Sequence, residues 1–80
     1  MSYKTPPSFV NAGTHKKVFY RVVERESISE FEGACEKLAN LINDCNGRVY
    51  GTMVMQRLSV LFSFEIPTVH VTQFIKSEAE

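Results

Sequence analysis

The sequence predicts a single α+β domain, in which one helix packs on one face of a mainly antiparallel sheet of three or four strands. Three observations support this class. Residues 27–47 form an amphipathic stretch with helical spacing, β-branched and aromatic segments lie on both sides of it, and 80 residues suffice for one small core. The expected order is β-α-β-β, followed by a further C-terminal strand.

The predicted helix carries signals at both ends. Ser27 or Ser29 can cap its start, because a glutamate lies three residues after each of them, as in a capping box. Asn46-Gly47 is expected to end it, because glycine takes the left-handed conformation without steric cost. Its apolar residues recur at three- and four-residue steps and therefore share one face. They are Phe31, Ala34, Cys35, Leu38, Leu41, Ile42 and Cys45.

The β segments follow in chain order. Residues 15–24 (HKKVFYRVVE) are the expected first strand, and residues 48–55 (RVYGTMVM) the second. Residues 58–66 (LSVLFSFEI) alternate apolar and polar side chains most regularly, so we place this third strand in the middle of the sheet. Pro67 ends it, and residues 68–75 (TVHVTQFI) resume β character as a fourth strand.

The domain itself is expected to span residues 15–76. Residues 1–14 contain Pro6-Pro7 and Gly13 and are interpreted as a flexible N-terminal arm, and residues 77–80 as a polar tail. No apolar run reaches the ~18 residues of a membrane span, and the N-terminus has no signal-peptide core. We therefore expect no membrane segment and a cytoplasmic location.

One helix cannot cover both faces of the predicted sheet. Apolar residues left on the other face indicate a contact surface for protein, either a second copy in a homo-oligomer or another protein. The expected contact set is Phe19, Val23, Tyr50, Val54 and Leu61. An alternative is strand exchange or edge pairing through the C-terminal strand, with Val69, Val71 and Phe74. Chains this short bury only about 60% of their unfolded surface, which also favours self-association.

Charge argues against a nucleic-acid binder as the first choice. Nine basic and nine acidic residues cancel, whereas nucleic-acid-binding domains are usually clearly basic. Residues 48–51 (RVYG) nevertheless resemble part of the RNA-recognition-motif strand signature. The alternative function is therefore nucleic-acid binding through basic and aromatic residues of the first two strands. Its candidate residues are Lys16, Lys17, Arg21, Arg48 and Arg57.

The residue pattern favours no enzyme, metal or cofactor. His15, His70 and the two cysteines show no metal-ligand spacing. Cys35 and Cys45 lie ten positions apart on one helix, about 15 Å, which is too far for a disulfide. We interpret both as reduced thiols. The glutamates near the helix start complement the helix dipole, and the four glycines form no phosphate-binding loop.

Residues 20–24 (YRVVE), 29–32 (SEFE), 38–42 (LANLI) and 47–51 (GRVYG) carry a resemblance to a known group. They resemble a family of small uncharacterised bacterial βαββ proteins, in which a YxVV strand precedes an FExxVNxLI-type helix. The resemblance spans about Val18 to Ile66, implies the βαββ fold and brings no assigned activity. Small size without recognisable chemistry is typical of accessory or regulatory proteins of phages and mobile elements. The expected function is thus non-enzymatic protein binding.

Overall fold

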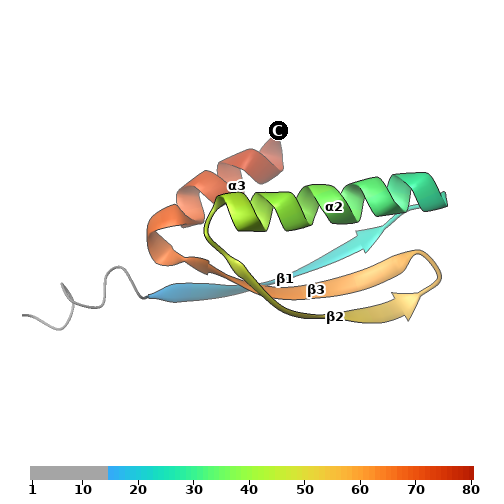
Figure 1. Ribbon diagram of the computed structural model, residues 1–80, viewed down its shortest axis with the longest axis horizontal. Helices are drawn as coiled ribbons and strands as arrows, with labels where there is room; N and C mark the ends of the chain where they lie inside the picture. The colour runs from blue at the N-terminus through green and yellow to red at the C-terminus, as the bar shows by residue number, and fades with distance from the viewer. Residues whose placement is uncertain (1–14) are drawn as a thin grey trace, which may run out of the picture.

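The computed structural model describes residues 15–80, so the arm predicted for residues 1–14 lies outside the described residues. Three strands and two α-helices make up the described chain (Figure 1). In order they are β1 (Lys16–Glu24), α2 (Ile28–Asp44), β2 (Arg48–Gln56), β3 (Ser59–Pro67), a 3₁₀ turn η1 (Thr68–His70) and α3 (Val71–Ala79). The fold is the predicted α+β class.

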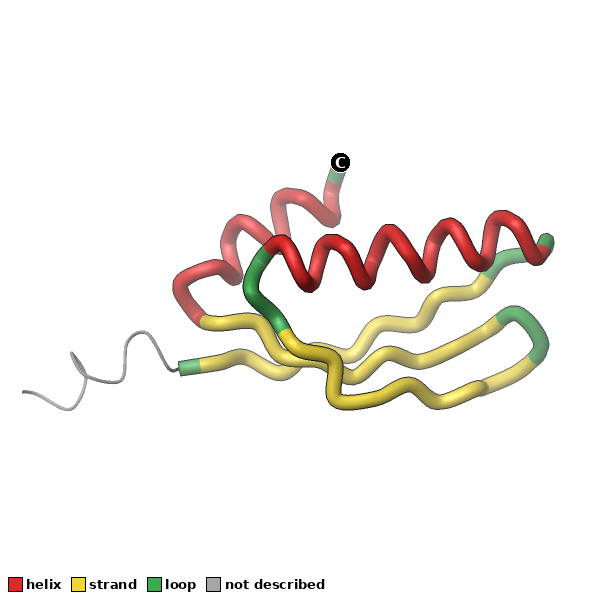
Figure 2. Tube along the Cα trace, viewed as in Figure 1, coloured by secondary structure: helices red, strands yellow, loops and turns green. Residues whose placement is uncertain are grey.

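The sheet has the strand order β1-β3-β2, with both pairings antiparallel, as the sequence predicted (Figure 2). Strand β3 lies in the middle because its apolar side chains are the most numerous and the most deeply buried of the three strands. Its register sets the faces of its neighbours. Phe19 lies opposite Phe64, and Val23 opposite Val60, so these four side chains share the face that the helices cover.

Helix α2 begins and ends as capping rules require. The Ser27 side chain accepts a hydrogen bond from the backbone N–H of Glu30 at 3.2 Å. At the other end Asn46, not the glycine, takes the left-handed conformation, with φ of 59°. The N–H of Gly47 donates to the carbonyl of Ile42 at 2.7 Å, and that of Asn46 to Asn43 at 3.0 Å, which is the Schellman pattern.

Gly47 is required for a different reason than the one expected from sequence. A Cβ on Gly47 would lie 2.6 Å from the carbonyl oxygen of Glu65 and 2.6 Å from Cδ1 of Ile66. The chain therefore crosses from α2 to β2 in direct contact with β3, where only glycine fits. Close approach, rather than a left-handed backbone, selects glycine at this position.

The core lies between the sheet and the two helices, which contact each other on the same side of the sheet (Figures 1 and 2). Three rings form its centre: Phe19, Phe64 and Phe74, with centroids 5.2–5.6 Å apart. Ile42 and Cys45 at the end of α2 are buried beside them. Strands β1 and β3 and helices α2 and α3 thus each contribute at least one side chain to the core.

The predicted fourth strand is wrong, because residues 68–79 are helical. Pro67 ends β3, and the segment then turns back over the sheet. Phe74 is fully buried and Val71, three residues earlier, is half-buried, so helical spacing places both on the core side. The helix also continues to Ala79 through most of the predicted polar tail.

The faces assigned to β1 are also corrected. Phe19 and Val23, expected on the uncovered face, are 7% and 6% exposed and lie in the core. The uncovered face of β1 carries Val18, Tyr20 and Val22 instead. The physical reason is Arg21, which shares the core-side face. It is tolerated there because Glu78 of α3 pairs with it, and that helix was not expected.

Candidate functional site: the open face of the sheet

The open face of the sheet is the side opposite the two helices. Five of its apolar side chains are 46–62% exposed. They come from both edge strands, and half-buried Leu61 of the middle strand lies between them. We call this set the open-face patch: Val18, Tyr20, Val22, Tyr50, Met53 and Leu61. In residues 15–80 no helix or strand covers it.

Register brings these residues together. Val22 and Met53 both lie opposite Leu61, one from each side, and Tyr20 lies opposite Ser63. Tyr50 occupies a register shift between Val49 and Gly51, so β2 holds one more residue there than β3. That bulge keeps the Tyr50 side chain on the open face, where its hydroxyl reaches Glu65.

A polar cluster closes one end of the open face. Glu65 is only 6% exposed although it lies on this face, because neighbouring side chains cover it. The hydroxyl of Tyr50 donates a hydrogen bond to its Oε1, and Nζ of Lys16 lies 3.0 Å from its Oε2. The hydrogen bond from Tyr50, followed by that from Lys16, lowers the pKa of Glu65 below its ordinary value. The same hydrogen bond raises the pKa of Tyr50.

The structure divides the residues predicted to bind a partner. Tyr50 and Leu61 lie in the open-face patch. Val54 is 81% exposed but lies opposite Val60, on the helix side of the sheet, beside a hollow lined by Phe31. Of the C-terminal alternatives, Val69 is exposed in η1, Val71 is half-buried, and Phe74 is a core residue.

Sequence reasoning missed four members of the patch: Val18, Tyr20, Val22 and Met53. Their alternation along each strand was visible, but alternation alone does not say which face is covered. The signal that could have found them is the register of β1 against β3. Pairing Phe19 with Phe64 places both aromatic rings on one side and leaves Tyr20 on the other.

The basic residues do not form one patch. Lys16 lies beside Glu65 on the open face, and Lys17, on the opposite side of β1, has its ammonium 5.9 Å from the Phe19 ring centroid. Arg21, on the helix side, makes two hydrogen bonds to Glu78, of 2.7 and 2.9 Å. Arg48 begins β2, and Arg57 lies in the turn at the far end of that strand. Among the described residues, these side chains therefore share no common surface. Nucleic-acid binding stays a prediction.

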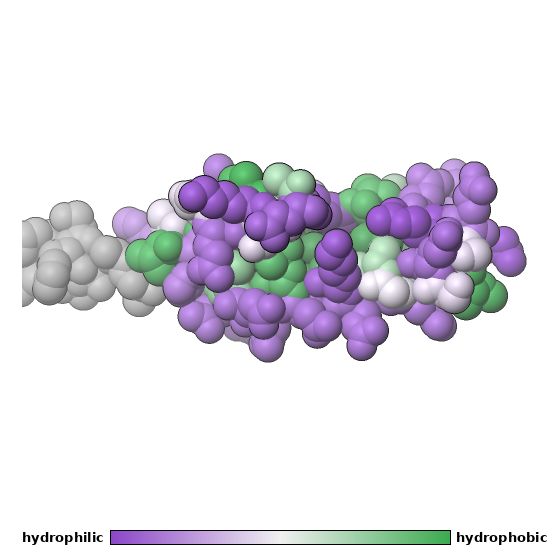
Figure 3. Space-filling model, turned by 90° about the horizontal axis from the view of Figure 1, so that it is seen from above, coloured by the Kyte–Doolittle hydropathy of each residue, from purple (hydrophilic) through white to green (hydrophobic). Residues whose placement is uncertain are grey.

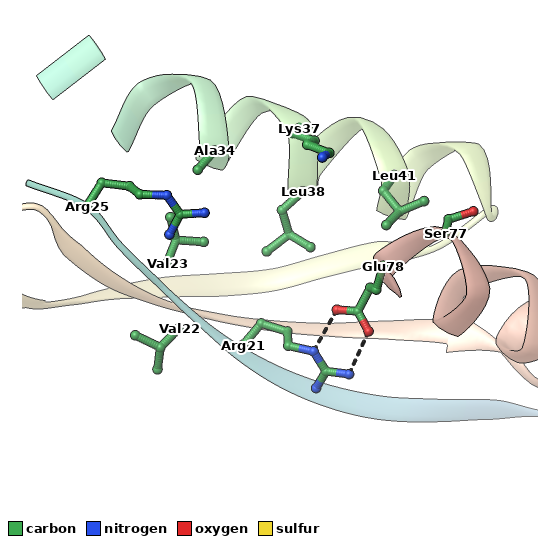
Figure 4. Close-up of a pocket in the computed structure, with 10 residues that line it drawn as sticks. All are labelled: Arg21, Val22, Val23, Arg25, Ala34, Lys37, Leu38, Leu41, Ser77 and Glu78. Carbon is green, nitrogen blue, oxygen red and sulfur yellow. Dashed lines mark hydrogen bonds and ion pairs between the residues drawn. The ribbon is translucent and has the colours of Figure 1, made fainter. Parts of the chain in front are cut away.

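The helix side carries a hollow of about 220 Å³ between β1, α2 and α3 (Figure 4). Val23, Leu38 and Leu41 line it, and the Arg21–Glu78 pair bridges it. Arg25 extends over Val23 and donates to the backbone carbonyl of Glu24 at 2.7 Å. Seen from this side, hydrophilic residues cover most of the surface, and hydrophobic residues form separate groups between them and at the rim (Figure 3). The hollow therefore holds a structural ion pair rather than converging reactive groups.

The two thiols lie away from the open face, and burial raises the pKa of both Cys35 and Cys45. A raised pKa keeps a thiol protonated and unreactive near neutral pH. Within residues 15–80, no three histidine, cysteine or acidic side chains converge on a common point. The described helices are also too short or too polar to cross a bilayer.

Comparisons with family models, with curated proteins and with solved structures found no match to this chain.

Proposed function

We propose that the protein is a small non-enzymatic protein-binding module that acts as a homodimer through its open-face patch. The observation that carries the proposal is the patch itself: five apolar side chains, each about half exposed, on one continuous face. Single exposed apolar residues are normal on proteins, but a contiguous group of them marks a contact surface.

The size of the face sets the expected strength of the contact. A nine-residue strand is about 30 Å long and adjacent strands lie about 4.8 Å apart, so three strands present on the order of 400 Å². Two such faces, stacked completely, would bury about 800 Å² in total, below the roughly 1,200 Å² at which standard specific interfaces begin and in the range of weak, transient contacts. We therefore expect copies to associate reversibly in the micromolar range rather than permanently.

The charges at the ends of the face support a second copy as the partner. Lys16 lies at one end of β1 and Glu24 at the other, both on the open side of the strand. A copy in reversed orientation therefore places opposite charges together. A partner that carried one sign of charge throughout would meet repulsion at one end.

Sedimentation velocity from low to high micromolar concentration tests the proposal. We expect the sedimentation coefficient of the wild-type chain to rise with concentration, and Tyr20→Glu to remain monomeric because it places a charge among the apolar side chains of the patch, between Val18 and Val22. Val69→Glu is the matched control, since Val69 is 63% and Tyr20 62% exposed but Val69 lies in η1. A wild-type chain that is monomeric at high micromolar concentration, or two variants that behave alike, would contradict the proposal.

A further inference from the structure

The two edges of the sheet differ in regularity. Strand β1 pairs with β3 through nine consecutive residue pairs without a break. Strand β2, at the other edge, has two register shifts, one between Val49 and Gly51 and one between Val54 and Gln56. Bulges disturb the row of backbone donors and acceptors and protect an edge from pairing with another chain. In the described chain, β1 is therefore the regular edge that still has an unpaired side.

The open side of β1 is self-complementary. Along the strand it presents Lys16, Val18, Tyr20, Val22 and Glu24. Read backwards, the order of side-chain types is the same except that the two charges exchange places. An antiparallel copy centred on Tyr20 therefore sets each lysine opposite a glutamate and each valine opposite a valine.

We propose that two copies join edge to edge through β1, antiparallel and centred on Tyr20, to form one six-stranded sheet. This inference rests on the proposed homodimer and places its contact at the β1 part of the open-face patch, Val18, Tyr20 and Val22, while the β2 part stays exposed. Lys16 of each copy lies opposite Glu24 of the other, and Val18 opposite Val22. Cross-strand apolar and opposite-charge pairs of this kind stabilise antiparallel ladders, and the two-fold symmetry forms each pair twice.

Both end charges are available for this contact. The Lys16 side chain is 48% exposed although it pairs with Glu65, and an ammonium has three hydrogens to donate. Glu24 is exposed and makes no ion pair with another residue in 15–80.

Other registers lose these pairs. Centring the ladder on Phe19 would set Lys16 opposite Val22 and leave Glu24 beyond the end of the partner strand. A shift of one residue in the centre moves every partner by two positions, so side-chain pairing, rather than the backbone, selects Tyr20 as the centre.

Charge exchange tests the register. We expect Lys16→Glu and Glu24→Lys each to weaken self-association about tenfold, because each sets like charges opposite each other twice per dimer. An equimolar mixture of the two variants should associate as tightly as wild type, and so should the double variant. Lys17→Glu is the matched control, since it makes the same charge change on the opposite side of β1. Circular dichroism checks folding, because Lys16→Glu also removes the ion pair with Glu65.

Cross-linking provides a test that does not depend on the folding of the Lys16 variant. Residue 20 lies opposite itself in this register, at a Cα separation of about 4.5–5.5 Å that a disulfide can bridge. Tyr20→Cys should therefore form a covalent dimer under mild oxidation, whereas Met53→Cys, on the far strand, should not. Cys35 and Cys45 contribute little background, because burial raises the pKa of both thiols.

Other results of these experiments would contradict either the register, the edge pairing or the homodimer itself. If the single charge variants associate as tightly as wild type, or their mixture does not recover, the register is wrong while homodimerisation stands. If Met53→Glu abolishes the dimer, the copies stack face to face instead of pairing at the edge. If wild type never associates, the proposed function itself fails, and the edge pairing fails with it.

Discussion

The two faces of the sheet are made by the same three strands but end in opposite environments. On the helix side, Phe19, Phe62 and Phe64 are at most 7% exposed, whereas on the open side Tyr20, Tyr50 and Met53 are at least 55% exposed. Apolar content alone does not separate the faces of β1, since each carries two or more large apolar residues. The middle strand decides, because β3 places its largest apolar side chains on one side and mainly serines and Glu65 on the other.

One face of the sheet therefore contributes folding stability, and the other provides a surface for contact with a partner. Over β1 and β3 the helix-side face is closed by α2 and α3, whose buried residues pack on Phe64, whereas Val54 of β2 stays exposed on that side. The open face keeps its apolar side chains in water, where burial by a partner releases free energy that intramolecular folding has not used. Substitutions on the two faces should therefore have separable effects on folding and on association.

The largest expected effect is the loss of folding stability on truncating the aromatic centre. Phe64→Ala should reduce the free energy of unfolding by about 3–5 kcal/mol, because it leaves a cavity between Phe19 and Phe74, whose rings lie 5.6 and 5.5 Å from its own. Small domains have roughly 5 kcal/mol of stability in total, so much of the population should unfold. Urea denaturation followed by circular dichroism measures the change.

Tyr20→Ala is the control for the open face. It removes a side chain of similar size from β1, yet exposed substitutions typically change stability by about 0.5 kcal/mol or less. We expect its denaturation midpoint, measured on dilute protein, to match that of wild type. Equal losses for Phe64→Ala and Tyr20→Ala would contradict the division between the two faces.

The second prediction concerns the crossing from α2 to β2, which holds the helix on its face of the sheet. Gly47→Ala should destabilise the fold by about 1–3 kcal/mol, because the new Cβ would lie 2.6 Å from the Glu65 carbonyl oxygen. Gly33→Ala is the matched control within α2, where a Cβ has no neighbour within 4 Å. This second change should stabilise the helix by about 0.5–1 kcal/mol, so the two glycines should shift the urea midpoint in opposite directions. A destabilised Gly33→Ala would show that the exposed side of α2 is packed against something.

Most of the fold was predictable from local pattern, and the exceptions have a common cause. The helix ends, the three strands and their order follow from spacing, caps and alternation that lie within short windows of sequence. Helix α3 could not be predicted from a short window of sequence in this way. Val69 and Val71 alternate as in a strand, whereas Val71 and Phe74 have helical spacing. The choice depends on Phe74 fitting between Phe19 and Phe64, residues ten or more positions away in the chain.

The same cause limited the prediction of the candidate site. Tyr50 and Leu61 were identified because they alternate with residues that had to face the helix. The open side of β1 was missed because Arg21 is acceptable in the covered face only through Glu78, 57 positions later. When a charged residue is accommodated on a covered face by a partner far away in the sequence, the residues near it give no sign that the face is covered.

The smallest expected effect is a pH dependence that originates on the open face. The hydrogen bond from Tyr50, with the contribution of Lys16, lowers the pKa of Glu65 in the folded chain. Folding therefore favours the ionised carboxylate, and this stabilisation is present above the unfolded pKa of about 4.3 and is lost as pH falls through the lower folded value. The raised pKa of Tyr50 acts in the other direction, so its contribution is present below pH of about 10 and is lost as pH rises through the folded value.

Tyr50→Phe tests this linkage, because it removes the hydroxyl and keeps the ring. Wild type should lose more stability than Tyr50→Phe between pH 6 and about pH 3, since only wild type has the hydrogen bond that holds Glu65 ionised. Urea midpoints measured across that range give the two slopes. Tyr20→Phe is the control on the same face, since its hydroxyl makes no hydrogen bond to another described side chain. Parallel slopes for wild type and Tyr50→Phe would mean that the hydrogen bond from Tyr50 to Glu65 does not make folding stability depend on pH. The open face would then provide a contact surface but no pH-dependent stability.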